Sequence, residues 1–192
     1  MARHRSVDAP AMPLITMPWS YIMTPADISQ FPEFRQIPLT KGYYAIVDAE
    51  NYEWLMQWKW HALAGKHTFY AARSTRRING RKTIVLMHRA IMSTGKGMQA
   101  DHKDGNGLMN CWDNLRVCTF TQNNRNVRPQ KNTSSRYKGG CWNKRENKWN
   151  ARINVDGKQI DLGHFISEHE AALVYNKAAI IHYGEFAKLK AE

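Results

Sequence analysis

The residues best suited to chemistry lie between Gln99 and Asn126. Asp101 directly precedes His102, and Asn114 and Asn123 follow in the same stretch. Carboxylate and amide oxygens are ligands that suit Mg²⁺, and an unperturbed imidazole titrates near physiological pH. This set could supply the general base and the cation that phosphodiester hydrolysis requires. The same residue types are also common in polar turns, so residue type alone leaves an ordinary loop open.

Each of these side chains can be given a separate role. His102 is the candidate general base, and Asp101 with Asn123 could hold the cation. Asn114 carries an amide that can bond backbone donors and acceptors on both sides of the loop, which would orient His102 indirectly. Adjacent strand residues point to opposite faces, so Asp101 and His102 cannot both face one point in an ideal strand. At a strand end that leads into a loop, this restriction relaxes.

The composition favours a polyanionic partner. The chain has 192 residues, with 28 Lys and Arg against 16 Asp and Glu, for a net charge of +12. Lysine and arginine release counterions when they neutralise phosphates, although a merely solvated basic surface fits the same numbers. The sequence contains no apolar run long enough to span a membrane and no secretory signal, and we expect no membrane partner.

The cysteines limit the metal chemistry. Cys111, Cys118 and Cys141 form no CxxC pair. They exclude a structural zinc site with four cysteine ligands in one chain, and we expect no zinc. A reducing compartment is the simplest interpretation.

The first half of the chain predicts an irregular arm followed by regular structure. Residues 1–38 hold six of the seven prolines, which oppose long helices and central strands. Strands are expected at 42–47, 60–63, 68–74 and 82–87, with helices at 50–58 and from His88. Asp48 could cap the first helix, and Asn79-Gly80 predicts a hairpin turn. The arginines around that turn are candidate phosphate contacts or simply solvated: Arg73, Arg76, Arg77 and Arg81.

The second half predicts a linker and a small separate unit. Residues 127–136 are polar and lack large core side chains. Strands are expected at 137–143, 148–154 and 158–164, and a capping box at Ser167–Glu170 starts a helix that Gly184 ends. The fold class is therefore α+β. The predicted divisions are an arm at 1–38, a domain at 39–126, the linker at 127–136 and a domain at 137–190.

The central stretch resembles the HNH endonucleases of the ββα-metal class. The resemblance rests on three ordered blocks: Asp101–Asn106, Asp113–Val117 and Thr121–Asn124. It implies two strands and a helix around one divalent ion, Mg²⁺ or Mn²⁺, with Asp101 and Asn123 as ligands. It also implies that His102 is the base and Asn114 the structural asparagine.

The sequence departs from the family pattern at two places. Asn123 stands where many members have histidine, and Met109-Asn110-Cys111 replaces an acidic and a basic residue of the loop. The second departure puts the internal ion pair of the loop in doubt. Upstream, His88 and Arg89 resemble the lead-in of phage and intron-encoded members and are candidate DNA contacts, His88 being equally open to a structural role.

The C-terminal unit resembles an APETALA2-type DNA-binding domain over roughly 134–190. The match rests on short motifs that include Leu162–Phe165 and Glu170–Ala179. It implies a three-stranded sheet that enters the major groove, with the helix packed behind it. The candidate DNA contacts are Lys138, Trp142, Lys144, Arg145, Trp149 and Arg152, while core packing is the simpler interpretation of Trp149. Cys141 stands where a DNA-contacting arginine is common, so the base preference of that family does not transfer.

These observations lead to one main hypothesis and two alternatives. The main hypothesis is a site-specific homing or nicking endonuclease of a phage or mobile element, acting on double-stranded DNA. A monomer is favoured, and the cytoplasm of a bacterial host is the expected location if a phage encodes the chain. The alternatives are a non-catalytic DNA-binding regulator with a nuclease-derived fold, and a nuclease directed at RNA.

Overall fold

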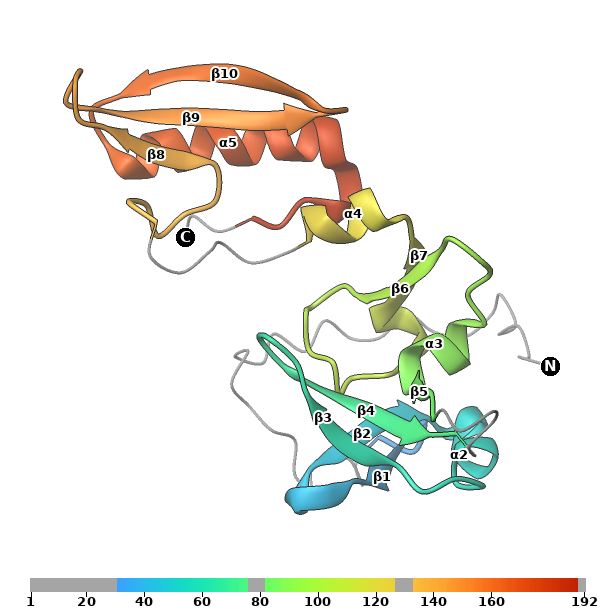
Figure 1. Ribbon diagram of the computed structural model, residues 1–192. Helices are drawn as coiled ribbons and strands as arrows, with labels where there is room; N and C mark the ends of the chain where they lie inside the picture. The colour runs from blue at the N-terminus through green and yellow to red at the C-terminus, as the bar shows by residue number, and fades with distance from the viewer. Residues whose placement is uncertain (1–30, 76–81, 127–132, 190–192) are drawn as a thin grey trace. The chain divides into compact units, whose positions relative to one another are not determined.

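The structure is a mixed α/β arrangement of several small sheets and helices (Figure 1). It is a computed structural model that describes residues 31–75, 82–126 and 133–189. The chain separates into two units, Met1–Thr119 and Phe120–Glu192. The first unit therefore ends before the predicted domain boundary at 126, because the helix that follows Thr119 makes its contacts with the C-terminal unit.

The first unit begins with a hairpin of β1 (Phe34–Pro38) and β2 (Tyr44–Asp48). Residues 34–38 were predicted to belong to an irregular arm, and this part of the prediction is wrong. Pro32 precedes the strand and Pro38 ends it, so neither proline interrupts the ladder. Phe34 and Ile37 are buried, which gives the short strand an apolar anchor.

Helix α2 (Ala49–Leu55) follows β2 directly, and Leu55 is its buried residue. Asp48 occupies the N-cap position as expected, but its side chain makes no capping hydrogen bond. Its Oδ2 instead accepts from the backbone N–H of Trp112, at 2.8 Å. The carboxylate therefore ties the start of α2 to a distant loop.

A second sheet and a short helix complete the framework of the first unit. Strands β3 (His61–Ala64), β4 (Phe69–Ser74) and β5 (Ile84–Leu86) pair antiparallel in that order. Helix α3 (Met87–Met92) continues from β5. The main core joins these elements through buried apolar residues: Ile37, Ala45, Val47, Leu55, Trp60, Ala71, Met87, Ile91 and Leu115.

The candidate site lies on the last hairpin of the first unit. Strands β6 (Gln99–His102) and β7 (Leu115–Cys118) pair antiparallel, and the 3-10 turn η2 (Trp112–Asn114) leads into β7. In their register, Asp101 lies opposite Arg116 and His102 opposite Leu115. His102 is thus the last residue of its strand, where adjacent side chains are less strictly held to opposite faces.

In the residues that the structure describes, the second unit has helices α4 and α5, one sheet and the 3-10 turn η3 (Gly184–Phe186). Helix α4 (Phe120–Arg125) comes first, and the sheet follows in the order β10-β9-β8, formed by β8 (Gly140–Asn143), β9 (Lys148–Val155) and β10 (Lys158–Phe165). Helix α5 (Glu168–Tyr183) runs across this sheet in Figure 1. Ser167 caps it by accepting from His169 N, at 3.2 Å. Small alanines on α5 allow close packing, with Ala178 and Ala179 against Ile153.

A close contact in this unit yields a stability prediction. Gly139 has φ +80, and a Cβ there would lie 1.9 Å from the Tyr175 ring. Gly157 has a similar φ of +81, but a Cβ there would meet nothing within 4 Å. Gly157→Ala therefore carries only backbone strain, about 1–2 kcal/mol. Gly139→Ala also overpacks the Tyr175 ring, which should lower the unfolding free energy by a further amount of about 1–3 kcal/mol.

Denaturant unfolding of the two variants measures this difference. Equal losses of unfolding free energy in Gly139→Ala and Gly157→Ala would contradict the tight packing of Tyr175 on Gly139.

Candidate active site

The centre of the candidate site is the buried His102 ring. Only 4% of His102 is exposed. Its Nε2 lies 3.3 Å from Oδ1 of Asn110, a residue with no exposed surface. Asn110 Nδ2 donates to the Gly107 carbonyl at 3.5 Å, which sets the amide orientation and presents Oδ1 to the ring. His102 Nε2–H is therefore the donor, and the ring nitrogen Nδ1 carries the lone pair in this tautomer.

Two aromatic rings enclose this imidazole. The centroid of His88, from α3, lies 4.7 Å from that of His102, and the centroid of Tyr70, from β4, lies 6.0 Å away. Burial lowers the pKa of His102. The hydrogen bond to Asn110 and the charges of Asp104 and Asp101 raise the pKa, but by less than burial lowers it. The ring is therefore neutral at physiological pH, which is the form that can accept a proton.

A loop of hydrogen bonds centred on Asn114 sets the position of His102. Asn114 Nδ2 donates to Asp104 Oδ1 and to the Met109 carbonyl, each at 2.9 Å. Its Oδ1 accepts from Asp104 N at 3.1 Å, and its carbonyl accepts from Lys103 N at 2.8 Å. These bonds close the segment between β6 and β7, as a bracing asparagine would. The catalytic role assigned to Asn114 remains a prediction.

The same loop is fastened to the preceding sheets. The backbone of Ile46 in β2 accepts from Asn110 N at 2.7 Å and donates to the Leu108 carbonyl at 2.9 Å. Gly107 N donates to Thr68 Oγ1 at 3.1 Å. A Cβ at Gly107 would lie 2.4 Å from the Phe69 carbonyl, so only glycine fits this approach. The loop is thus held on one side by β2 and on the other by the start of β4.

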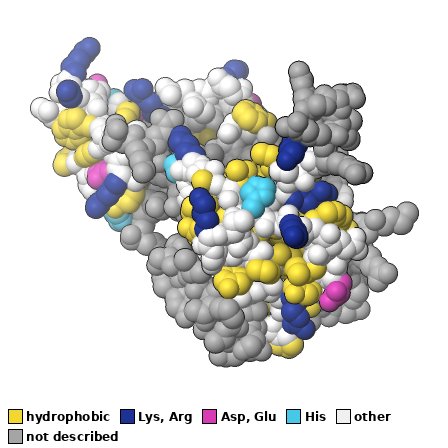
Figure 2. Space-filling view, turned by 60° about the horizontal axis from the view of Figure 1, so that its bottom comes forward, with side chains coloured by type: hydrophobic (Ala, Val, Ile, Leu, Met, Phe, Trp, Pro, Cys, Tyr) yellow, Lys and Arg dark blue, Asp and Glu magenta, His cyan; other side chains and the backbone are white. Residues whose placement is uncertain are grey.

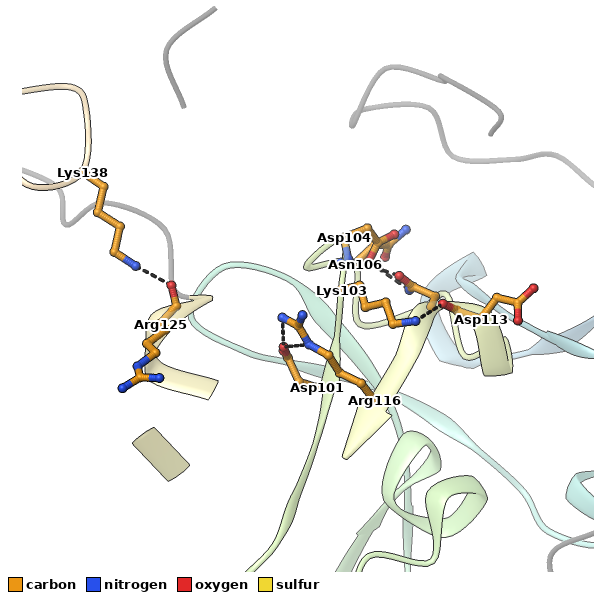
Figure 3. A network of polar contacts seen from close by, with 9 residues as sticks. Asp101, Lys103, Asp104, Asn106, Asp113, Arg116, Arg125 and Lys138 are labelled. Carbon is orange, nitrogen blue, oxygen red and sulfur yellow. Dashed lines mark hydrogen bonds and ion pairs between the residues drawn. The ribbon is translucent and has the colours of Figure 1, made fainter. Parts of the chain in front are cut away.

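Asp101 lies beside His102 in a buried ion pair. Arg116 Nη2 and Nε donate to Asp101 Oδ2 at 2.8 and 3.1 Å, and both residues are less than a tenth exposed. Figure 3 shows this pair, with Lys103 near Asp113 on the same hairpin. Arg116 belongs to one of the resembling blocks, but no role could be assigned to it from the sequence alone. Its position opposite Asp101 in the β6–β7 register explains the pair.

The Asp101 carboxylate is an oxygen ligand of the type that hard cations prefer. Among the residues that the structure describes, no three His, Cys, Asp or Glu side chains come together to hold a metal ion. A divalent ion would therefore combine the Asp101 carboxylate with amide, water or phosphate oxygens, a set that fits Mg²⁺. Asn123, the second predicted ligand, is a partly exposed residue of α4 in the second unit. Its pairing with Asp101 remains a prediction from the spacing and the resemblance.

The predicted DNA contacts of the first unit fall into different environments. Arg89 is exposed on α3. Arg73 is partly buried, with its guanidinium 4.4 Å from the Trp58 ring centroid and 5.8 Å from that of Trp60. His88 is only 5% exposed and packs on His102, which favours the structural role left open by the sequence. Arg76, Arg77, Arg81 and the Asn79-Gly80 turn lie outside the described residues.

The predicted contacts of the second unit also differ from one another. Lys144, Arg145 and Arg152 are exposed, and Arg152 Nε lies 3.7 Å from Asp161 Oδ2. Trp142 and Trp149 pack edge to face with centroids 5.1 Å apart. Alternation along β9 places Trp149 on the face of Ile153, which α5 covers.

Lys138 is partly buried, and its Nζ donates to the Arg125 carbonyl at 2.6 Å. All six residues of the second unit remain predicted DNA contacts, with Arg152, Lys144 and Arg145 the most accessible.

Figure 2 shows one face of the molecule with Lys and Arg side chains around a histidine patch and few acidic side chains. Such a face would attract a polyanion. No helix in the described part of the chain is long and apolar enough to cross a membrane.

His88 leads to a prediction about acid stability. Burial, followed by His102 and Arg89, lowers the pKa of His88 to about 3 from 6.5. Between these values the unfolded chain binds a proton that the folded chain does not. Unfolding free energy therefore falls as the pH drops below 6.5, by up to about 1.4 kcal/mol per pH unit. His88→Phe should remove this part of the dependence.

Denaturant unfolding of the first unit above and below pH 6.5 provides the measurement. His182→Phe, at an exposed position of α5, is the matched control and should keep the wild-type slope. An unchanged slope in His88→Phe would contradict a buried neutral imidazole.

Two viral proteins are similar in sequence to this chain. Protein 3.8 of Escherichia phage T7 is 32% identical over 110 residues, which cover 57% of this chain and 90% of the phage protein. A protein of Acanthamoeba polyphaga mimivirus, named "Uncharacterized HNH endonuclease L560", is 30% identical over 153 residues, which cover 77% of this chain and 74% of that protein. No family model matches the chain, and no solved structure gives a significant match. The mimivirus relative establishes the family, and the chain belongs to the HNH endonucleases.

Proposed function

We propose that this chain is a DNA endonuclease that hydrolyses phosphodiester bonds with one divalent ion, Mg²⁺ or Mn²⁺. The observation that carries the proposal is the buried His102 ring, oriented by Asn110 and adjacent to the Asp101–Arg116 pair. A neutral imidazole with a fixed tautomer is what a general base requires. The HNH name of a viral relative supports the same reaction class.

The roles of the residues follow from their contacts. Nδ1 of His102 takes the proton of the attacking water, while Asn110 keeps Nε2 protonated and the ring in place. Asn114 closes the loop that carries Asn110. Asp101 and Asn123 would hold the ion, and Arg116 orients the Asp101 carboxylate. The ion, when bound, would stabilise charge on the phosphate and on the leaving oxygen.

The two units divide the work in this proposal. The first unit supplies the general base His102 and the carboxylate Asp101, and the second unit acts as an APETALA2-like module that selects the DNA site. The exposed Lys144, Arg145 and Arg152 support this division. The sheet surface is not uniformly basic, since His164 pairs with Glu146 and Arg152 lies near Asp161. Mixed charge of this kind suits selective contacts better than uniform attraction to phosphate. With one site per chain, a monomer would nick one strand.

Cleavage of supercoiled plasmid in Mg²⁺ or Mn²⁺ tests the function. We expect nicked circles as the first product. His102→Ala should slow cleavage by about 10²–10⁴-fold, the usual contribution of a general base. His182→Ala, at an exposed position of α5, should cleave like the wild type.

Three outcomes of this assay would overturn parts of the proposal. Undiminished cutting by His102→Ala would remove His102 as the base. Faster cleavage of RNA than of DNA of the same sequence would change the substrate. Binding of DNA that includes the native target, without any cleavage, would favour a non-catalytic regulator.

Asn110 provides a second, independent prediction. Asn110→Leu keeps a similar volume but removes the acceptor for His102 Nε2. We expect cleavage to fall by about 10–100-fold, as when the partner of a functional histidine is lost. DNA affinity should stay at the wild-type value, because Asn110 has no exposed surface.

Asn110→Asp is the matched variant, since it keeps an acceptor oxygen at the same position. It should cleave faster than Asn110→Leu. If the leucine variant cleaves as fast as the wild type, the ring is not oriented by this contact.

A further inference from the structure

Helix α4 is too short to fix its own position. It contains six residues and no buried side chain, and it carries the predicted ligand Asn123. Isolated helices of fewer than about 12–15 residues are marginal in water, so contacts with other elements must hold this one.

The last residue of α4 makes most of these contacts. The guanidinium carbon of Arg125 lies 4.6 Å from the centroid of the Tyr183 ring. Its Nη2 lies 3.4 Å from Asp156 Oδ1, and only 18% of the Arg125 side chain is exposed. Asp156 is itself 86% exposed, so the ion pair is weak and the stacking on Tyr183 is the stronger contact.

The platform under Arg125 is rigid. Tyr183 is the last residue of α5 and is mostly buried in the core of the second unit. Its Oη donates to the Asn154 carbonyl at 2.6 Å, which fixes the ring relative to β9. Arg125 therefore stacks on a side chain that cannot easily move.

Lys138 holds the same end of the helix by its backbone. Its Nζ donates to the Arg125 carbonyl at 2.6 Å, as Figure 3 shows. The last carbonyls of a helix have no partner within the helix. A cation at this end also interacts favourably with the partial negative charge of the helix dipole. Burial and nearby Lys188 lower the pKa of Lys138 to about 8, so most of its population remains charged at neutral pH.

A cavity confirms that α4 lies along this surface. Its volume is about 390 Å³, and Thr121 and Asn124 of α4 line it together with Asn154 and Tyr175. Four parts of the second unit thus contact α4: the segment before β8, the β9–β10 hairpin, the end of α5 and the 3-10 turn η3 (Gly184–Phe186).

We propose that Arg125 is a positioning residue through which the C-terminal unit sets Asn123 for metal binding. The inference rests on the proposed function, because it takes Asn123 as a ligand of the divalent ion. Asn123 and Arg125 are two residues apart on one short helix, so a rotation or fraying at Arg125 moves the Asn123 amide.

The test uses the full chain with Arg125→Ala and Arg125→Lys. Arg136→Ala is the matched control, because Arg136 also stacks on a tyrosine, Tyr137 at 4.9 Å, and lies 3.6 Å from a glutamate, but it is not on α4. Four quantities are measured: the Mn²⁺ dependence of plasmid cleavage, Mn²⁺ binding by electron paramagnetic resonance, DNA affinity in EDTA, and amide hydrogen exchange of α4.

We expect Arg125→Ala to raise the Mn²⁺ concentration needed for half-maximal cleavage and binding by about 10-fold or more. Amide exchange in α4 should be faster, while DNA affinity in EDTA stays within about 2-fold of the wild type, since a lost non-specific ion pair costs little. Arg125→Lys keeps the charge but not the planar stacking on Tyr183. Its Mn²⁺ requirement and its α4 exchange rate should therefore lie between those of the wild type and Arg125→Ala. Arg136→Ala should match the wild type in all four measurements.

Wild-type Mn²⁺ dependence and wild-type α4 exchange in Arg125→Ala would overturn the inference. An equal loss in Arg136→Ala would also overturn it, because the effect would then be a general weakening of the unit. A wild-type chain that neither cleaves DNA nor binds Mn²⁺ would instead refute the proposed function. In that case, the exchange data still decide whether Arg125 anchors α4.

Discussion

The candidate site depends on the hydrogen bonds by which Asn114 closes the segment between β6 and β7. The pairing of Lys103 N with the Asn114 carbonyl extends the ladder one step beyond His102 and Leu115. The Asn114 side chain then joins Asp104 to Met109 across the loop. This closure brings Asn110 under the His102 ring, although the two residues are eight positions apart. The first sheet serves the same end, because Ile46 of β2 forms backbone hydrogen bonds with Leu108 and Asn110, on either side of Met109.

Burial explains why the charges of the site are arranged as they are. An unpaired charge in a site less than a tenth exposed would be strongly unfavourable, and Asp101 is matched by Arg116 across the hairpin. Removing one member of such a pair typically costs about 3–5 kcal/mol, because it leaves the other charge buried. The two histidines avoid this cost by remaining neutral. The same low polarity that stabilises the neutral rings leaves His102 in the form that can act as a base.

The sequence predicted those features that depend on local pattern. The β4, β9, β10 and α5 elements were placed within a residue or two, because alternation, the Asp156-Gly157 turn and the Ser167 cap are local signals. The ability of the Asn114 amide to tie the loop to the strands could be inferred from residue type, and its hydrogen bonds to Asp104 and Met109 are of this kind. The pairing of Phe34–Pro38 was missed, because proline density outweighed two buried apolar residues. Asn110, Arg116 and the position of His88 could not be found, because each depends on contacts between segments that the sequence does not show to be adjacent.

Helix α4 shows most clearly why a linear division into domains fails. By sequence it ends the nuclease motif, and by contact it belongs to the C-terminal unit. The cause is specific: the final carbonyl of α4 is capped by Lys138, and its final side chain stacks on Tyr183. A polar helix of six residues gains little from its own hydrogen bonds, so a few such contacts decide where it belongs.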